Sequence, residues 1–238
     1  MYHIKLFNKI SESGLSHLDP ADFVYSEDAA EYDGIIVRSA ALHDVEFPAS
    51  LEAIARAGAG VNNIPVDACS QKGVVVFNTP GANANAVKEL VLAGLFLASR
   101  DIVGGIEWAH TLKGQQGVAK LVEKGKSSFV GPEIEGKTLG VIGLGAIGAM
   151  VANAAHSLGM DVYGYDPYMS VKSAWGVSRH VKHAKSLGEV YANCDYITIH
   201  VPLSGDTKGM LNKAAFAQMK DGVRVLNFSR GGLVDSTD

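Results

Sequence analysis

Short apolar runs separated by polar intervals dominate the first third of the chain. Four of them have the length of buried strands, at residues 3–7, 34–38, 53–57 and 74–77. Apolar runs that alternate with crossover segments are typical of a parallel sheet. Two turns that follow these strands, Arg38-Ser39 and Gly58 to Asn63, fall at the carboxyl edge where ligands bind in such sheets. Both turns are therefore candidate substrate loops, although Arg38 alone could equally form a surface salt bridge.

A long helical pattern follows the breaker Asn78 to Gly81 and runs over residues 86–112. Its apolar positions cover an unusually wide surface, which predicts burial on two sides. Either a subunit interface, giving a homodimer through the 86–112 helix, or a simple core within one domain would provide the second side. Residues 113–136 are rich in Gly, Lys, Ser and Gln, so we expect an irregular connection there.

The second half of the chain also alternates short apolar runs with polar or helical intervals. Strands are predicted at residues 138–142, 161–165, 195–201 and 224–228, with helical patterns at 149–158 and 211–219. The sequence therefore predicts an α/β chain with two doubly wound parallel-sheet domains, residues 1–84 and 85–238.

The first of these later strands is followed by G-x-G-x-x-G, formed by Gly143, Gly145 and Gly148, and the next strand ends in Asp166. The glycines allow a tight turn, a close approach to a pyrophosphate and close helix packing, and the helix N-terminus attracts the anion. Asp166 can accept the hydroxyls of an adenine ribose and would repel a 2′-phosphate, which predicts NAD rather than NADP. The alternative is a packing turn without a ligand.

The composition narrows the possible classes of protein function further. The hydrophobic fraction is 47%, the formal net charge is −4 and the basic residues are scattered, so neither a nucleic-acid nor a membrane surface is indicated. The longest apolar run, residues 90–98, is too short to span a membrane. Cys69 and Cys194 fit buried thiols of a cytoplasmic protein. His180 and His183 have no third ligand nearby, so no metal site is expected.

Taken together, the motifs resemble those of the NAD-dependent D-2-hydroxyacid dehydrogenases, and among them the bacterial D-3-phosphoglycerate dehydrogenases most. The motifs are IVRS (36–39), AGAGVNNI (57–64), VIGLGAIG (141–148), YDPY (165–168), HVPL (200–203) and NFSRGGLVD (227–235). The resemblance covers the whole chain in the family's order. It implies a flavodoxin-like substrate domain and a Rossmann NAD-binding domain.

The resemblance also implies roles for individual residues. Arg230 matches the catalytic arginine that binds the substrate carboxylate and polarises the C2 carbonyl. Substrate contacts are implied for Arg38, Ser39, Ala59, Gly60, Val61 and Asn83, with Arg38 as a phosphate partner. Cofactor contacts are implied for Gly143, Gly145, Ala146, Ile147, Gly148, Asp166, Pro167, His200, Val201, Pro202, Thr207, Phe228, Ser229 and Arg230. His200 is then part of the adenine pocket and not the catalytic acid.

This sequence departs from the family pattern at three places. Ala146 stands where many relatives have arginine, and Asn62 where many have aspartate. The family's catalytic glutamate and histidine, which follow the arginine motif, do not occur before Asp238. We therefore expect both domains to be incomplete at their C-terminal ends and the 238-residue chain alone to be nearly inactive, because loss of a positioned acid/base typically costs about 10²–10⁴-fold.

The implied reaction is NAD-dependent oxidation of 3-phosphoglycerate to 3-phosphohydroxypyruvate, at the entry to serine synthesis. Another small 2-hydroxy acid is the alternative substrate. From a different class, a non-catalytic NAD-binding protein, like the corepressors that share the fold, is the alternative function.

Overall fold

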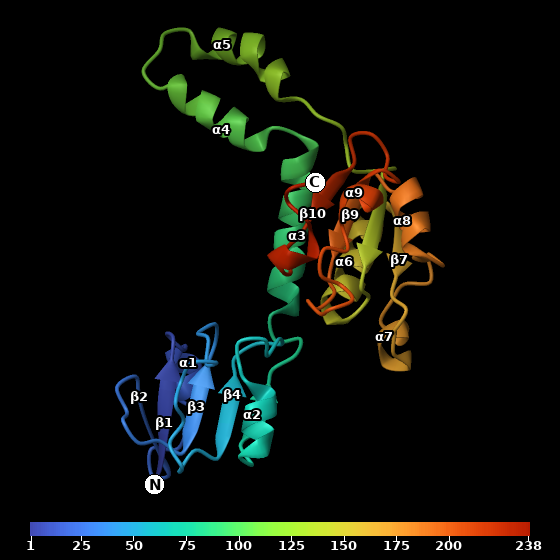
Figure 1. Cartoon of the computed structure of the whole chain (residues 1–238). Coiled ribbons are helices and arrows are strands. Elements are labelled where there is room, and N and C mark those ends of the chain that lie inside the picture. The colour runs from blue at the N-terminus through green and yellow to red at the C-terminus, as the bar shows by residue number, and fades with distance from the viewer. The chain divides into compact units, whose positions relative to one another are not determined.

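The chain divides into two compact units, residues 1–83 and 84–238. The computed structural model describes residues 1–238, apart from the side chain at position 172. The boundary between the units lies one residue before the boundary placed by the sequence. Each unit contains one five-stranded, fully parallel sheet (Figure 1), so the predicted α/β class is confirmed.

The first unit has the strand order β2-β1-β3-β4-β5, the order of flavodoxin-like folds. Its strands are β1 (Tyr2–Phe7), β2 (Phe23–Ser26), β3 (Gly34–Val37), β4 (Ala53–Arg56) and β5 (Val75–Asn78), and its helices are α1 (Glu12–Leu15) and α2 (Val66–Gln71). The sequence predicted four of these strands and missed the edge strand β2. In the core of this unit, Ile35, Val37 and Ile54 are almost fully buried.

The second unit has the strand order β10-β9-β6-β7-β8, which is the order 5-4-1-2-3 of a Rossmann fold. Its strands are β6 (Thr138–Ile142), β7 (Asp161–Tyr165), β8 (Lys182–His183), β9 (Tyr196–Ile199) and β10 (Arg224–Leu226). The predicted bounds of β6 and β7 are confirmed, whereas β8 was missed because it has only two residues. Two short 3-10 helices, η1 (Lys126–Phe129) and η2 (Gly231–Leu233), complete the unit with the helices α3 (Ala84–Ser99), α4 (Ile102–Thr111), α5 (Val118–Gly125), α6 (Ala146–Ser157), α7 (Val171–Trp175), α8 (Leu187–Asn193) and α9 (Lys213–Phe216).

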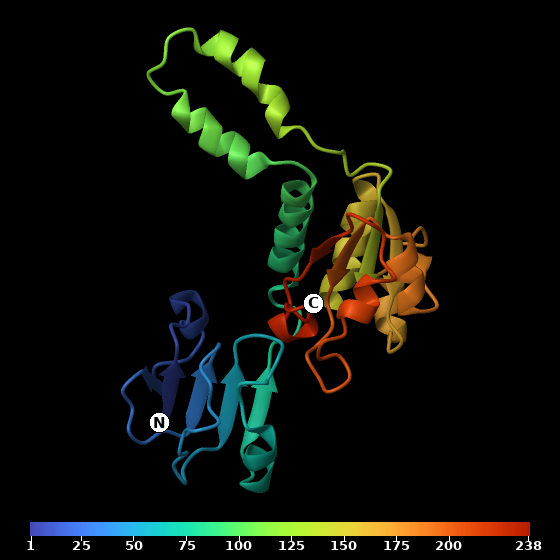
Figure 2. The same ribbon diagram turned by 45° about the horizontal axis from the view of Figure 1, so that its top comes forward.

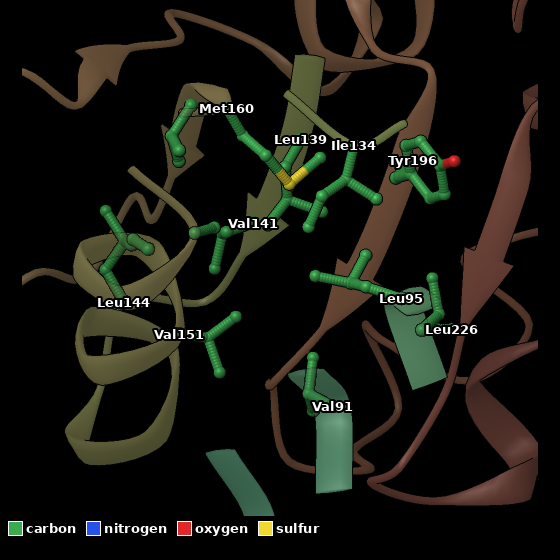
Figure 3. Close-up of a cluster of buried hydrophobic side chains, with 13 residues drawn as sticks. Val91, Leu95, Ile134, Leu139, Val141, Leu144, Val151, Met160, Tyr196 and Leu226 are labelled. Carbon is green, nitrogen blue, oxygen red and sulfur yellow. The ribbon is translucent and has the colours of Figure 1, made fainter. Parts of the chain in front are cut away.

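Apolar side chains bury both faces of the second sheet. On one face, Val91 and Leu95 of α3 and Val151 of α6 pack with Leu139 and Val141 of the central strand (Figure 3). On the other face, α8 and α9 cover a second cluster that includes Ile197 and Ile199. The central strands β6 and β9 are therefore almost fully buried, which fixes the loops at their carboxyl ends.

The predicted single helix over residues 86–112 is wrong. The chain forms α3 and α4, separated by Arg100 and Asp101, because the Asp101 side chain accepts a hydrogen bond from Gly104 N at 2.9 Å and so begins a new helix. The expectation of an irregular connection at 113–136 is also wrong, since α5 and η1 lie there. The two helices α4 and α5 form a hairpin, visible in both views (Figures 1 and 2). Trp108 of α4 packs against Phe129 of η1, which follows α5.

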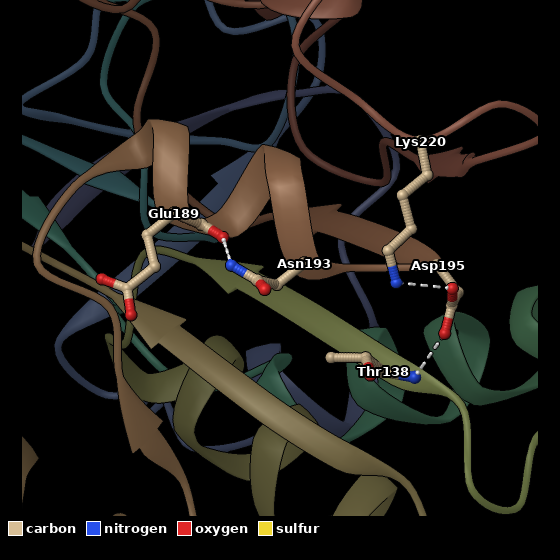
Figure 4. A network of polar contacts seen from close by, with 5 residues as sticks. All are labelled: Thr138, Glu189, Asn193, Asp195 and Lys220. Carbon is tan, nitrogen blue, oxygen red and sulfur yellow. Dashed lines mark hydrogen bonds and ion pairs between the residues drawn. The ribbon is translucent and has the colours of Figure 1, made fainter.

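Polar contacts tie the amino ends of the central strands together. Asp195 accepts hydrogen bonds from Thr138 N and from Lys220 Nζ, each at 2.9 Å (Figure 4). Burial acts to raise the pKa of Asp195, but these hydrogen bonds outweigh it and lower the pKa below its usual value. The carboxylate therefore stays charged and holds the start of β6 beside the segment before β9.

Both cysteines, Cys69 and Cys194, are buried and free. Burial raises the pKa of the Cys194 thiol to about 12, which leaves it without thiolate reactivity. Among the described residues, no helix combines the length and apolar character needed to cross a membrane. His180 and His183 belong to no metal-binding cluster in the described part of the chain.

Candidate functional site

The glycine turn after β6 is packed tightly against the end of β9. Gly143 has φ +90°, a conformation that side chains disfavour, and an added Cβ would lie 2.8 Å from the His200 carbonyl oxygen and 2.9 Å from Val201 Cγ1. Gly148 is equally confined, because its Cβ would meet the carbonyl oxygen of Gly143. These two glycines are therefore required by the fold itself.

Gly145 differs from both. No atom outside its immediate neighbours lies within 4 Å of the position of its Cβ, and its φ is −70°. It caps α6 without a side-chain hydrogen bond, so the amides of Ala146 and Ile147 in the first turn have no intrahelical acceptor. An open glycine beside free amides at a helix N-terminus is the environment that a pyrophosphate needs.

Asp166 at the end of β7 faces this turn. One carboxylate oxygen accepts a hydrogen bond from Leu144 N and the other from Tyr168 N, both at 2.9 Å. Each oxygen of a carboxylate has two acceptor sites, so one site on each oxygen is left for a ligand hydroxyl. The carboxylate is thus held in place by two backbone amides of the chain itself.

A cavity of about 430 Å³ opens beside the turn. Residues from the ends of β6, β7 and β9 line it together with the loops that follow. Eight of the predicted cofactor residues are in this lining: Gly143, Gly145, Asp166, Pro167, His200, Val201, Pro202 and Thr207. The other lining residues are Ile142, Tyr165, Tyr168, Leu187, Ser204, Asp206 and Met210.

Thr207 fixes one wall of the cavity. Its hydroxyl donates to the Pro202 carbonyl at 2.6 Å and accepts from Ser204 N at 2.8 Å. These two bonds close the loop that follows β9 onto itself. The wall is therefore shaped by the chain's own contacts.

His200 is a neutral member of this wall. Its Nε2 lies 3.0 Å from the hydroxyl of Thr198, and its Nδ1 is buried without a hydrogen-bond partner among the described residues. Burial lowers the pKa of His200 to about 4. A histidine with so low a pKa cannot carry a proton at neutral pH, which agrees with a wall residue rather than a general acid.

The remaining predicted cofactor residues do not line this cavity. Ile147 packs against the core cluster, so the backbone amide is its polar group toward the turn. Phe228 packs on the same cluster, and Ser229 donates its hydroxyl to the Ile199 carbonyl at 2.8 Å. Arg230 is exposed, and its Nη1 donates to the Ser229 carbonyl at 3.2 Å. Because β6, β9 and β10 are parallel neighbours, the glycine turn, His200 and Arg230 follow strand ends at the same edge.

In the first unit, Arg38 and Ser39 follow β3 and are exposed. The side chain of Asn8 accepts from Ser39 N at 2.8 Å and from Ala40 N at 2.7 Å, and Asn8 itself has φ +73°. The turn after β3 is therefore held by the residue that follows β1. Sequence reasoning did not identify Asn8.

The loop after β4 contains Ala59, Gly60 and Val61. The Ala59 carbonyl accepts from Asn78 Nδ2 at 2.7 Å, and the Gly58 carbonyl accepts from Thr79 N at 2.9 Å. This fixes the loop through its carbonyl groups. Asn83, predicted to contact substrate, is the last residue of the first unit and is exposed.

Sequence reasoning also missed Arg56, the last residue of β4. Its guanidinium packs so closely beneath Gly58 that a Cβ there would collide with it, which places a cation under the loop of Ala59 to Val61. The sequence could have indicated Arg56 by its position at the carboxyl end of a parallel strand. Arg38 was identified by the same kind of position after the neighbouring strand.

The fold and this site define a class. Residues 95–238 match the family described as D-isomer specific 2-hydroxyacid dehydrogenase, NAD binding domain. This match covers more than half of the chain, and the chain belongs to the D-2-hydroxyacid dehydrogenase family.

Several curated relatives of the chain are phosphoglycerate dehydrogenases. The chain is 36% identical to D-3-phosphoglycerate dehydrogenase of Rattus norvegicus over 236 residues, which cover 95% of this chain and 41% of the relative. It is 33% identical to D-3-phosphoglycerate dehydrogenase of Bacillus subtilis over 99% of this chain and 45% of the relative. The chain thus spans less than half the length of these relatives.

Solved structures share the fold over nearly the whole chain. The cofactor (NAD⁺)-bound 3-phosphoglycerate dehydrogenase of Entamoeba histolytica superposes with a TM-score of 0.74 at 26% identity, covering 99% of this chain and 74% of that one. The similarity supports the two-sheet architecture.

Proposed function

We propose that the protein is an NAD-dependent dehydrogenase that oxidises 3-phosphoglycerate to 3-phosphohydroxypyruvate. The observation that carries the proposal is the glycine turn, in which Gly143 and Gly148 are required by packing while Gly145 borders open space. A turn that served only packing would need no third glycine there. The family match and the phosphoglycerate dehydrogenases among the relatives support the reaction class and the substrate.

NAD is preferred over NADP because of Asp166. Its carboxylate, fixed by Leu144 N and Tyr168 N, offers acceptors to the two ribose hydroxyls. A 2′-phosphate would place negative charge against this carboxylate, and like charges so close to each other repel. Pro167 and the wall from His200 to Pro202, with Thr207, enclose the adenosine part.

Arg230 is the catalytic arginine of this proposal. The bound nicotinamide supplies the hydride acceptor, and Arg230 binds the substrate carboxylate and stabilises charge on the C2 oxygen. A guanidinium forms paired hydrogen bonds with a carboxylate, and a fixed positive charge lowers the energy of a developing oxyanion. The exposed position of Arg230 leaves its donors available for this.

The first unit supplies the substrate contacts. Backbone amides of Ala59, Gly60 and Val61 grip the carboxylate, and Arg38, Ser39 and Asn83 complete the contacts. The cationic group of Arg38 accounts for preference for a phosphorylated substrate, since arginine suits phosphate geometry. Another small 2-hydroxy acid is the alternative if Arg38 makes no such contact.

A polypeptide of these 238 residues alone is proposed to be nearly inactive. His200 is the imidazole in the cavity lining, and its pKa of about 4 makes it a poor acceptor for the proton of a substrate hydroxyl at neutral pH.

We also propose that the protein is a homodimer through α3 and α4. No residue of α4 is buried, and Ile102, Val103 and Ile106 are exposed on it. On α3, Leu90 and Leu97 are exposed as well. A second copy of the chain would cover this apolar surface. Neither nucleic acid nor membrane is proposed as a partner, and the cytoplasm is the proposed location.

The test of the function is NADH formation by the purified full-length protein, with 3-phosphoglycerate and with unphosphorylated glycerate. The proposal requires turnover with NAD and a higher kcat/KM for the phosphorylated acid. If only glycerate is oxidised, the proposed substrate is wrong, while the proposed type of reaction stands. NAD binding without turnover of any 2-hydroxy acid would instead support a non-catalytic NAD-binding protein.

A further inference from the structure

The loop that carries Arg230 is organised by the side chain of Asn227. Its Oδ1 accepts a hydrogen bond from Ser229 N at 3.0 Å, and its Nδ2 donates to the Arg230 carbonyl at 2.8 Å. The side-chain amide of Asn227 therefore pairs with one backbone donor, Ser229 N, and with one backbone acceptor, the Arg230 carbonyl. These two groups flank the Ser229–Arg230 peptide bond. These contacts fix the direction in which the backbone leaves residue 229 and enters Arg230.

The two residues between Asn227 and Arg230 anchor the same loop to the sheet. The ring of Phe228 packs on α3 so closely that a Cβ at Gly94 would lie 2.8 Å from it. The hydroxyl of Ser229 donates to the Ile199 carbonyl on β9. Phe228 and Ser229 thus hold the loop in place, while Asn227 sets the local path of the chain at Arg230.

Arg230 itself has little to restrain it. Its side chain is exposed, and the hydrogen bond that we observe for its guanidinium goes to the carbonyl of the preceding residue at 3.2 Å. A long side chain with so few contacts is directed mainly by its own backbone. The precision of its placement must then come from the groups that fix that backbone.

We propose that Asn227 is a positioning residue for Arg230, an inference that rests on the function proposed above. Asn227 contacts neither substrate nor cofactor in this role. It acts through the carbonyl of Arg230 and the amide of Ser229, and so keeps the guanidinium aligned with the substrate carboxylate and the C2 oxygen. A misplacement of about 1 Å in such a group can reduce the rate by about 100-fold.

The experiment is a double-mutant cycle in the full-length protein, with Asn227→Ala, Arg230→Ala and the double variant. Asn227→Ala is expected to lower kcat/KM for 3-phosphoglycerate by about 10- to 100-fold, while the NAD dissociation constant changes by less than about twofold. In the Arg230→Ala background the same substitution should lower kcat/KM by less than about twofold, because a residue that acts only through Arg230 has nothing left to position.

Two further variants separate positioning from folding. Asn227→Asp keeps an acceptor for Ser229 N but loses the donor to the Arg230 carbonyl, so the loop can fold while the alignment is lost, and kcat/KM should still fall by about tenfold. Asn193→Ala is the control, because Asn193 is an exposed asparagine whose amide donates to the Glu189 carbonyl within α8 at 2.7 Å (Figure 4). It should leave kcat/KM and NAD binding unchanged.

The outcomes distinguish the inference from the function on which it rests. Additive losses in the cycle, or a loss of NAD affinity that parallels the loss of turnover, would overturn the role of Asn227 and leave the dehydrogenase standing. Wild-type kcat/KM in both Asn227 variants would overturn it as well. Absence of turnover by the wild-type protein with any 2-hydroxy acid would remove the proposed function and this inference together.

Discussion

The carboxylate of Asp166 and the backbone amide of Leu144 are joined by a hydrogen bond of 2.9 Å. This bond connects the end of β7 to the glycine turn after β6, two segments 22 residues apart. It places the acidic group that we propose to select the ribose beside the amides that we propose to receive the pyrophosphate. The two functions of a dinucleotide site therefore depend on one local arrangement.

Replacement of Asp166 tests this arrangement. Asp166→Ala is expected to weaken NAD binding by about 10- to 100-fold, since hydrogen bonds to a charged group contribute about 1.5–3 kcal/mol. NADP should be affected less, because the repulsion of its 2′-phosphate disappears. Titration calorimetry with both dinucleotides measures the two effects. The control is Asp161→Ala, at the opposite end of β7, where the exposed carboxylate contacts Lys182; equal effects of both substitutions would argue against the ribose contact.

Substitution of the turn glycines should affect NAD binding at one position and folding stability at another. Gly145→Ala is expected to leave the thermal unfolding temperature nearly unchanged, because its Cβ meets open space, yet to weaken NAD binding by about tenfold or more by crowding the pyrophosphate. Gly148→Ala should lower the unfolding temperature, since its Cβ collides with the Gly143 carbonyl. Gly14→Ala, also in open space but in α1 of the first unit, is the control that should leave NAD affinity unchanged. Unchanged NAD affinity in Gly145→Ala would show that the turn does not receive the pyrophosphate.

The buried imidazole of His200 predicts a specific pH dependence of stability. Its pKa is lowered from 6.5 to about 4 by burial, so the unfolded chain takes up a proton that the folded protein refuses between these values. The free energy of unfolding therefore keeps its full contribution from His200 above pH 6.5. As the pH falls toward 4, the free energy of unfolding decreases by about 3 kcal/mol.

Urea denaturation between about pH 4 and 7 measures this effect against His200→Gln, which keeps a polar side chain without the titration. The wild-type curve should fall more steeply on acidification than that of the variant. Parallel curves would mean that His200 is protonated as readily in the folded protein as in the unfolded chain.

The exposed apolar surface of α4 predicts the oligomeric state. Ile106→Glu is expected to convert a dimer into a monomer in light scattering, because a charge would be buried without a partner at the interface. Val171→Glu provides a matched control, since Val171 is an exposed apolar residue on α7. A monomeric wild-type protein, or a dimer that tolerates Ile106→Glu, would contradict the proposed interface.

Much of the fold could be predicted because its signals are local. The strands 138–142 and 161–165 are short, apolar and bounded by turn residues, and the glycine pattern between them is typical of a dinucleotide-binding turn. The break between α3 and α4 was hidden because apolar residues continue across Asp101, although an aspartate three residues before Gly104 is an N-cap signal. The edge strand β2 was missed because three of its four residues are exposed, so that it shows no alternation of buried and exposed positions.

The supports of the site could not be predicted in the same way. Asn8, Asn78 and Asn227 each fix a loop through side-chain hydrogen bonds to the backbone, and for Asn8 the partners lie 31 and 32 residues away. Asparagine is common in turns for purely local reasons, so its presence after a strand does not show which backbone groups it binds. The contacts of Asn8 and Asn78 become visible only when separate loops are placed side by side, and those of Asn227 only when the path of its own loop is known.

The most direct test of the central claim is the steady-state rate of NADH formation from 3-phosphoglycerate by the full-length protein and by its Arg230→Ala variant. The wild-type protein should turn over the substrate with NAD, and the variant should lose about 100- to 1,000-fold in kcat/KM, as expected when a charge that stabilises the oxyanion is removed, while its affinity for NAD is retained. A wild-type protein that binds NAD but oxidises no 2-hydroxy acid, or a variant as active as the wild type, would contradict the assignment of this site to a dehydrogenase.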